Sequence, residues 1–246
     1  MTNGYSMAQA RIDLTAALRW AARLGLHEGI CNHFSLQAPG LPDCFLVNPH
    51  GLHWSEITPN DLVLVDEDGQ VIQGRYKVEA TALHIHGRLH LGKPNATCVL
   101  HTHMPYATAL ALTDGGRLEW ASQTALRFYG RVAYDECYNG PVLDAEEGDR
   151  ICAQMQNADV LWLANHGVIV CGDSVAQAFD NLYYLERACQ VQVLAQSTGK
   201  PLKLVPEEIA AQTGQQAVAD TIQPKLHFEA LKRMLDRDEP GWREWR

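Results

Sequence analysis

Two short apolar segments that end in histidine constrain this chain more than any other feature. The first is Cys98-Val99-Leu100-His101-Thr102-His103, and the second is 160–164, followed by Asn165 and His166. Short apolar segments of this kind are typical of buried β-strands. Side chains alternate between the two faces of an extended chain, so His101 and His103 are expected to project the same way from one strand end.

His101, His103 and His166 would together make a three-histidine set if the two strands were neighbours. Three imidazoles with an open fourth position are typical of a catalytic metal site, whereas structural zinc sites are closed by four ligands. The alternative is that one or two of them are ordinary strand-end histidines, because an HxH pattern also recurs by chance. Spacing alone leaves both interpretations open.

Length and composition favour one α/β domain; the alternative is two small domains, although nothing in the sequence marks a boundary between them. The chain has 246 residues, 46% of them apolar, which is enough to bury a substantial core. Its net charge of −9 is spread along the chain without a basic run, which argues against nucleic acid and weakly against an anionic membrane as partner. No apolar run approaches the ~20 residues of a membrane span. We also expect no signal peptide.

Cysteine usage points to a reducing compartment. The seven cysteines are odd in number and scattered, and none forms a CxxC pair. Neither a zinc knuckle nor a disulfide framework is therefore indicated. We expect a cytoplasmic protein.

Apolar periodicity predicts an ordered series of elements. Helices are expected over 8–25, 79–91, 105–112, 146–155 and 174–196, with two more in a C-terminal helical tail over about 205–246. Strands are expected over 34–37, 44–47, 62–66, 71–72, 97–101, 159–164 and 167–171. The weaker segment 115–140 carries several aromatic residues. This order favours a largely antiparallel sheet covered by helices.

The helix over 79–91 contributes three more histidines, His84, His86 and His90. His86 and His90 are one turn apart and share a face. A second metal site is one interpretation, but the helix is short of carboxylates. The favoured interpretation is a packed, hydrogen-bonded His86 beneath the strand that carries His101.

Two glycine-containing segments, 29–35 and 48–51, place polar side chains where a backbone can approach an anion closely. Each is also consistent with a plain turn. The phosphate-binding, dinucleotide-binding and nucleophile-elbow patterns GxxxxGK[ST], GxGxxG and GxSxG are absent, which argues against the commonest NTPases, dehydrogenases and hydrolases.

Taken together, these segments resemble the class II aldolase/adducin-head family over about residues 10–200. The matching segments are 28–35, 48–51, 98–103, 163–167 and 183–189, the last being similar to the bacterial adducin-like branch. The resemblance implies a single αβα domain, 1–246, with a central, mostly antiparallel sheet. It also implies a divalent ion, usually zinc and sometimes manganese, on His101, His103 and His166. Enzymes of the family form fourfold-symmetric tetramers with active sites between neighbours.

One departure from the family pattern matters. Sugar-phosphate aldolases of the family carry a Ser-Glu pair at the start of the helix before the HxH strand, and that Glu is the acid/base. Counting back from Pro94 without gaps places Thr81 and Ala82 there. Alanine cannot move a proton, and Glu79, about one turn away, is the candidate replacement. The loss favours a decarboxylase or another lyase over a sugar-phosphate aldolase.

The expected function is a divalent-metal-dependent lyase, of aldolase or decarboxylase type, acting on a small hydroxy-carbonyl or carboxylate substrate through a metal-stabilised enediolate. Zinc is the first candidate metal, with manganese or iron as alternatives. The alternatives in function are a non-catalytic adducin-like assembly or sugar-binding module, and redox chemistry at an iron site. Candidate catalytic residues are Tyr129, His33, His50 and Glu79, and candidate substrate-binding residues are Asn32, Ser35, Asn48, Gly51 and Thr81.

The expected partners are a small-molecule substrate and further copies of the chain. The resemblance implies a homo-oligomer, with a tetramer expected. The aromatic residues of 115–140, together with Trp242 and Trp245, are candidates to close over a neighbour's pocket. The alternative is that these aromatics pack within their own subunit.

Overall fold

One eight-stranded sheet organises the computed structural model, which describes residues 5–245. The strands lie in the order β4-β3-β2-β1-β5-β8-β7-β6. Neighbouring strands are antiparallel except β6 and β7, which are parallel. The strands are β1 (His33–Gln37), β2 (Cys44–Val47), β3 (Val63–Asp66), β4 (Val71–Gln73), β5 (Cys98–Thr102), β6 (Val132–Asp135), β7 (Val160–Leu163) and β8 (Gly167–Gly172). The predicted mostly antiparallel sheet is confirmed.

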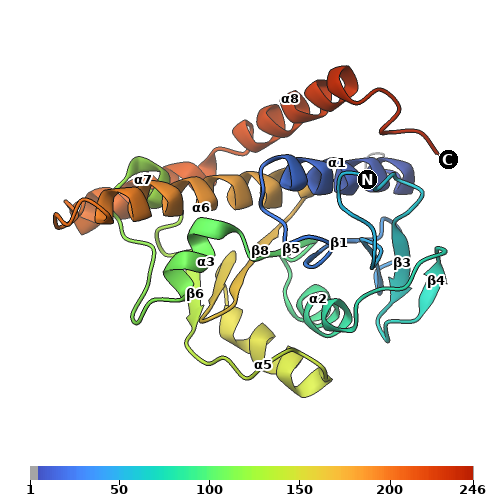
Figure 1. Ribbon diagram of the computed structural model, residues 1–246, viewed down its shortest axis with the longest axis horizontal. Helices are drawn as coiled ribbons and strands as arrows, with labels where there is room; N and C mark the ends of the chain where they lie inside the picture. Colours follow the sequence, from blue (N-terminus) through green and yellow to red (C-terminus); the bar gives the residue numbers. More distant parts are fainter. Residues whose placement is uncertain (1–4, 246) are drawn as a thin grey trace.

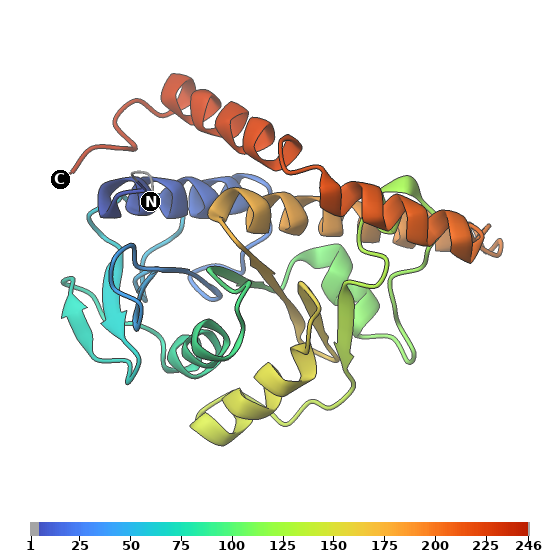
Figure 2. The same ribbon diagram turned by 180° about the vertical axis from the view of Figure 1, so that it is seen from behind.

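Helices cover both faces of the sheet. They are α1 (Met7–Arg23), α2 (Ala80–Gly92), α3 (Pro105–Ala111), α4 (Gln123–Leu126), α5 (Ala145–Met155), α6 (Val175–Gln196), α7 (Glu207–Ala219) and α8 (Gln223–Asp238). Helices α1 and α6 lie on one face and α2 and α5 on the other, as Figures 1 and 2 show from opposite sides. The molecule is therefore a single α/β domain with three layers. None of the helices within residues 5–245 combines the length and apolarity needed to cross a bilayer.

Alternation along the central strand β5 divides its side chains between two cores. Cys98 and Leu100 pack into the larger core with α1 and α6. Val99 packs into the smaller core with α2 and α5. Since side chains two apart share a face, His101 follows Val99 toward the α2 side of the sheet. The period of the strand thus directs the HxH motif away from the main core.

The predicted elements coincide with the observed ones apart from the segment 115–140. Ser174 caps α6, its hydroxyl accepting from the backbone N–H of Gln177 at 3.2 Å. The segment 115–140 contains α4 and the edge strand β6, which the sequence pattern did not predict. The apolar run of this strand, Val132 to Tyr134, is only three residues long, and three of the four residues of β6 are only partly buried.

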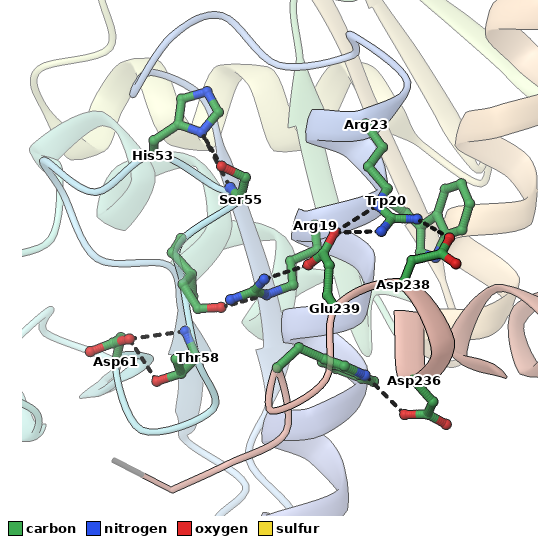
Figure 3. A network of polar contacts seen from close by, with 12 residues as sticks. Arg19, Trp20, Arg23, His53, Ser55, Thr58, Asp61, Asp236, Asp238 and Glu239 are labelled. Carbon is green, nitrogen blue, oxygen red and sulfur yellow. Dashed lines mark hydrogen bonds and ion pairs between the residues drawn. The ribbon is translucent and has the colours of Figure 1, made fainter. Parts of the chain in front are cut away.

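The C-terminal tail folds back along α1 instead of standing free. The indole of Trp20 donates to the carbonyl oxygen of Leu231 in α8 at 2.9 Å. Arg19 and Arg23 both form ion pairs with Glu239, at 2.5 and 2.6 Å (Figure 3). These contacts fix the end of the chain on the first helix.

The two C-terminal tryptophans have different environments. Trp242 is 3% exposed in the main core, and its indole donates to Asp236 at 2.9 Å. The expectation that Trp242 closes over a neighbour's pocket is therefore wrong, because its own subunit buries it. Trp245 remains 52% exposed.

Candidate metal centre

The three predicted ligands meet at one end of strands β5 and β8. His101 lies in β5, His103 follows it, and His166 lies in the tight turn between β7 and β8. One nitrogen of each ring lies within 4.8 Å of those of the other two rings. Gly167 allows this approach, because a Cβ there would lie 2.5 Å from the carbonyl oxygen of Thr102. The turn therefore sits directly against β5.

Protein partners occupy one nitrogen on two of these rings and leave the other nitrogen available. His101 donates from Nδ1 to the carbonyl oxygen of Val168 at 3.0 Å. His103 uses Nδ1 for a hydrogen bond to the carboxylate of Glu28. The Nε2 atom of His103 is buried without a hydrogen-bond partner. An unpartnered buried nitrogen of this kind fits a metal ligand.

Burial keeps these imidazoles in the form that binds metal. Burial lowers the pKa of His101 well below its usual range, and the neighbouring His166 adds to the effect. The pKa of His166 is lowered to about 4, first by burial and then by the charge of His103. A metal ligand must be a neutral imidazole, so both rings are ready to bind at neutral pH. The donor set therefore fits one divalent cation.

A cavity of about 270 Å³ opens beside the three histidines. Its further lining residues are Glu28, Cys31, Asn32, His33, Glu79, Thr81, Ile85, Tyr138, Gly140, Pro141 and Val142. A space of this size fits a small metabolite. Four of the predicted site residues, Asn32, His33, Glu79 and Thr81, are in this lining.

The other predicted site residues lie outside the cavity lining of this chain: Ser35, Asn48, His50, Gly51 and Tyr129. Ser35 is fully buried, and His86 and His90 occupy its hydroxyl, so it lies behind the cavity wall. The Tyr129 hydroxyl donates to Glu207 at 3.0 Å instead.

Asn48 has a structural task near the cavity. Its side-chain oxygen accepts from the backbone N–H of Phe34 at 2.8 Å, and its side-chain nitrogen donates to the carbonyl oxygen of Asn32 at 3.4 Å. Asn32 itself has a left-handed backbone, with φ of 73°. Asn48 thus holds the turn that presents Asn32 to the cavity.

The profile of the class II aldolase and adducin N-terminal domain matches residues 12–193. The chain belongs to this family. A crystal structure of an aldolase II superfamily protein from Pseudomonas syringae is similar to it, with a TM-score of 0.91, 35% identity, and coverage of 98% of this chain and 97% of that one.

Two further relatives differ in their chemistry. The decarboxylase NovR of Streptomyces niveus is 32% identical over 227 residues, which are 89% of this chain and 83% of NovR. An L-fuculose 1-phosphate aldolase from Glaciozyma antarctica has a TM-score of 0.86 and 25% identity, with coverage of 99% of this chain and 97% of that one. The relatives of this chain thus include a decarboxylase and an aldolase.

In this family member, position 82 does not face the cavity. Ala82 is 1% exposed and packs in an apolar cluster with Phe45, Val47, Val63 and Val65. Glu79 lies at the N-cap of α2 and makes no side-chain capping bond there. A carboxylate introduced at 82 would enter the apolar cluster, so Ala82→Glu is not expected to restore an acid/base. Glu79 is the carboxylate that the backbone directs to the cavity from this helix start.

Two cavity residues were not assigned a role from the sequence. Glu28 bonds His103, although it lies 75 residues earlier in the chain. The ring centroid of Tyr138 lies 6.1 Å from that of His166, in the segment whose structure the pattern did not predict. The resemblance, whose first segment begins with Glu28, offered a signal for Glu28 but none for Tyr138.

Proposed function

We propose that this class II aldolase family member is a divalent-metal-dependent lyase that breaks a carbon–carbon bond in a small hydroxy-carbonyl or hydroxy-carboxylate substrate. The observation that carries the proposal is the set of three converging histidine nitrogens at the wall of a small cavity. The decarboxylase and aldolase named among the relatives support this reaction class.

His101, His103 and His166 would hold the cation. A divalent cation bound there supplies Lewis acidity, which stabilises the negative charge that develops on substrate oxygens as the bond breaks. Glu28 keeps the His103 ring in one orientation and leaves its Nε2 atom free. Zinc is our first candidate because a three-imidazole set suits it, and manganese or iron is the alternative.

Glu79 is our candidate for proton transfer. It lines the same cavity as the three histidines, and no side-chain capping bond holds its carboxylate at the start of α2. Bond cleavage leaves a carbanion that must receive a proton, and a carboxyl group at the cavity wall can deliver it. General acid–base catalysis typically contributes ~10²–10⁴-fold to a rate. Glu79→Gln is therefore expected to lower turnover within that range, while Glu146→Gln, at an exposed position of α5, leaves it unchanged.

We also propose that the functional unit is a homo-oligomer, with a tetramer as the expected size. Tyr129, a candidate catalytic residue, lies outside the cavity of its own chain. A catalytic role for Tyr129 therefore requires the cavity of a neighbouring subunit. Exposed apolar side chains on and between the tail helices, Val218, Ile222 and Leu226, offer apolar surface for such contacts. Sedimentation at micromolar concentration tests this, and a monomer would rule out a shared site.

Metal analysis and product detection test the lyase proposal. The purified protein is expected to carry about one divalent ion per chain. Zinc-, manganese- and iron-loaded samples are then assayed for carbon dioxide release from hydroxy-acids and for aldehyde release from ketose phosphates. We expect at most trace cleavage of fuculose- or rhamnulose-type phosphates. A protein that binds no dication would contradict the lyase and support the non-catalytic adducin-like alternative.

A further inference from the structure

A continuous series of hydrogen bonds runs from the cavity into the protein between β1 and α2. We name it the buried chain. From the cavity inward its members are Thr81, His33, His86, Ser35, His90 and the carbonyl group of Ala96. Its three histidines and its serine are nearly or fully buried. The direction of each hydrogen bond in it follows from the group at the inner end.

The inner end fixes the first proton. His90 Nδ1 lies 2.6 Å from the carbonyl oxygen of Ala96, and a carbonyl oxygen only accepts, so Nδ1 carries a proton. Burial lowers the pKa of His90 to about 4, which makes the ring neutral at neutral pH. Its Nε2 atom is therefore bare. Ser35 Oγ, 2.6 Å away, must donate to it.

The donor and acceptor at Ser35 follow by the same reasoning. A serine hydroxyl has one proton, and His90 has already taken it. His86 Nδ1, 2.5 Å from the serine oxygen, must therefore donate. Burial, together with the electrostatic influence of the neighbouring His90 ring, holds the pKa of His86 well below its usual range, so its Nε2 is bare. His33 Nδ1, 2.8 Å away, donates to that nitrogen.

At the cavity, His33 is left with a bare Nε2 atom. Its ring stacks on that of His101, with centroids 4.9 Å apart and planes inclined by 29°. Thr81 Oγ1 lies 3.3 Å from His33 Nε2 and donates to it. The hydroxyl proton of Thr81 is then committed, so only its lone pairs face the cavity.

We propose that the Ala96 carbonyl, acting through the buried chain, makes the Thr81–His33 corner of the cavity an acceptor of hydrogen bonds. The corner receives a substrate hydroxyl and disfavours a carboxylate or phosphate oxygen, which has no proton to offer. His86, Ser35 and His90 are positioning residues that act through His33. The substrate statement rests on the proposed function, whereas the bond directions belong to the protein alone.

Matching spacings on β1 and α2 explain why the three histidines and the serine of the buried chain contact one another. His33 and Ser35 are two apart on β1, which separates them by about 6.6 Å. His86 and His90 are four apart on α2, which separates them by about 6 Å along the helix. The two pairs therefore stand opposite each other, and Ser35 lies between the two rings of α2.

Ring ¹⁵N NMR of the protein without added metal tests the bond directions. We expect His33, His86 and His90 each to show a protonated Nδ1 and an unprotonated Nε2. Loss of one signal set in His33→Gln assigns His33. A protonated Nε2 on His33 in the unmodified protein would overturn the proposal. This readout is independent of activity, so it stands even if the lyase function fails.

Two variants test whether the buried chain causes this state. Ser35→Ala removes the hydroxyl that links His90 to His86 by hydrogen bonds, and is expected to leave His33 as a mixture of both tautomers. His90→Gln offers an amide oxygen to Ser35 and is expected to retain the single His33 tautomer. Ser55→Ala, which removes an exposed serine–histidine bond to His53, is the matched control. An unchanged His33 in folded Ser35→Ala would contradict the proposal. If that variant fails to fold, loss of the single tautomer in His90→Gln would contradict it.

Small hydroxy-acids probe the substrate statement with zinc-loaded protein. Lactate and glycerate share a 2-hydroxy-carboxylate unit, and glycerate adds one hydroxyl. One added hydrogen bond is worth about 1 kcal/mol, so glycerate is expected to bind about fivefold tighter than lactate. 3-Phosphoglycerate, with a phosphate in place of that hydroxyl, is expected to bind more weakly than glycerate. Tighter binding of 3-phosphoglycerate would overturn the acceptor assignment.

Discussion

Two sets of three histidines lie side by side in this protein and have opposite tasks. His101, His103 and His166 converge on a cavity, whereas His33, His86 and His90 form a buried chain. The sets touch where His33 stacks on His101. All three rings of the second set are buried, whereas in the first set His101 is buried and His103 and His166 are partly buried. Burial lowers the pKa of His101 and His166 in the first set and of His86 and His90 in the second. Residue type and the direction of the pKa shift therefore do not distinguish them.

Hydrogen-bond partners do distinguish them. Both ring nitrogens of His86 and of His90 have protein partners. His103 bonds Glu28 through Nδ1 only, and its buried Nε2 has no partner. A buried polar atom without a partner costs free energy unless something else satisfies it. The first set, which we call the open set, therefore suits a cation. The second set, which we call the closed set, stabilises the fold and orients the cavity wall.

The largest expected effect removes one member of the open set. His103→Ala should abolish binding of zinc while the protein stays folded, because the sheet and its cores form without the ion. Metal content after gel filtration and circular dichroism measure the two parts. His50→Ala, at an exposed position outside the cavity lining, is the control and should bind metal normally. Full metal retention in His103→Ala would remove the distinction between the two sets.

The next largest effect is expected from acidification, which lowers the free energy of unfolding through the buried histidines of the closed set. His90 has a pKa of about 4 in the folded protein, below the ~6.5 of an unfolded histidine. The unfolded state therefore takes up the proton first, and stability present above about pH 6.5 is lost as the pH falls toward 4. The loss from His90 is about 3 kcal/mol. Urea unfolding at several pH values measures it.

His90→Gln sharpens the pH experiment because glutamine does not titrate. Its unfolding free energy should fall less between neutral pH and about pH 4.5 than that of the unmodified protein. Other buried histidines, including His86, account for the remaining slope. Equal slopes for the two proteins would show that His90 is not held neutral by the fold.

Opening the closed set by one hydroxyl has a smaller expected effect. Ser35→Ala leaves one ring nitrogen each of His86 and His90 buried without a partner. Each such loss costs at least about 1 kcal/mol, so the free energy of unfolding should fall by at least about 2 kcal/mol. Denaturant unfolding near pH 7 measures it. Ser55→Ala breaks an exposed bond of the same type and should cost about 0.5 kcal/mol or less.

The smallest expected effect concerns the carboxylate behind the open set. Glu28→Gln weakens the hold on His103 Nδ1 and should reduce metal affinity about 10–100-fold, as is typical when such an outer partner is lost. Competition with a chelator of known affinity measures the change. Glu208→Gln, on the exposed side of α7, should leave affinity unaltered. An unaltered affinity in Glu28→Gln would mean that the other ligands alone orient the site.

The sequence alone determined most of the fold and the three histidines that converge at the cavity. Apolar periodicity marked helices and strands because it records which side chains must be buried. The HxH spacing placed His101 and His103 on one face, since alternation is a local property of an extended backbone. The edge strand β6 was not predicted, because its apolar run is only three residues long and three of its four residues are only partly buried.

Only the tertiary structure decided what the remaining polar residues do. Glu28 reaches His103 across 75 positions, and Ser35 meets His86 across 51, so no local pattern pairs them. The face of α2 decided that Glu79, rather than position 82, lines the cavity. The local periodicity of apolar residues indicates which residues are buried. Which buried nitrogen finds a partner depends on how distant elements pack, and that distinguishes the open set from the closed one.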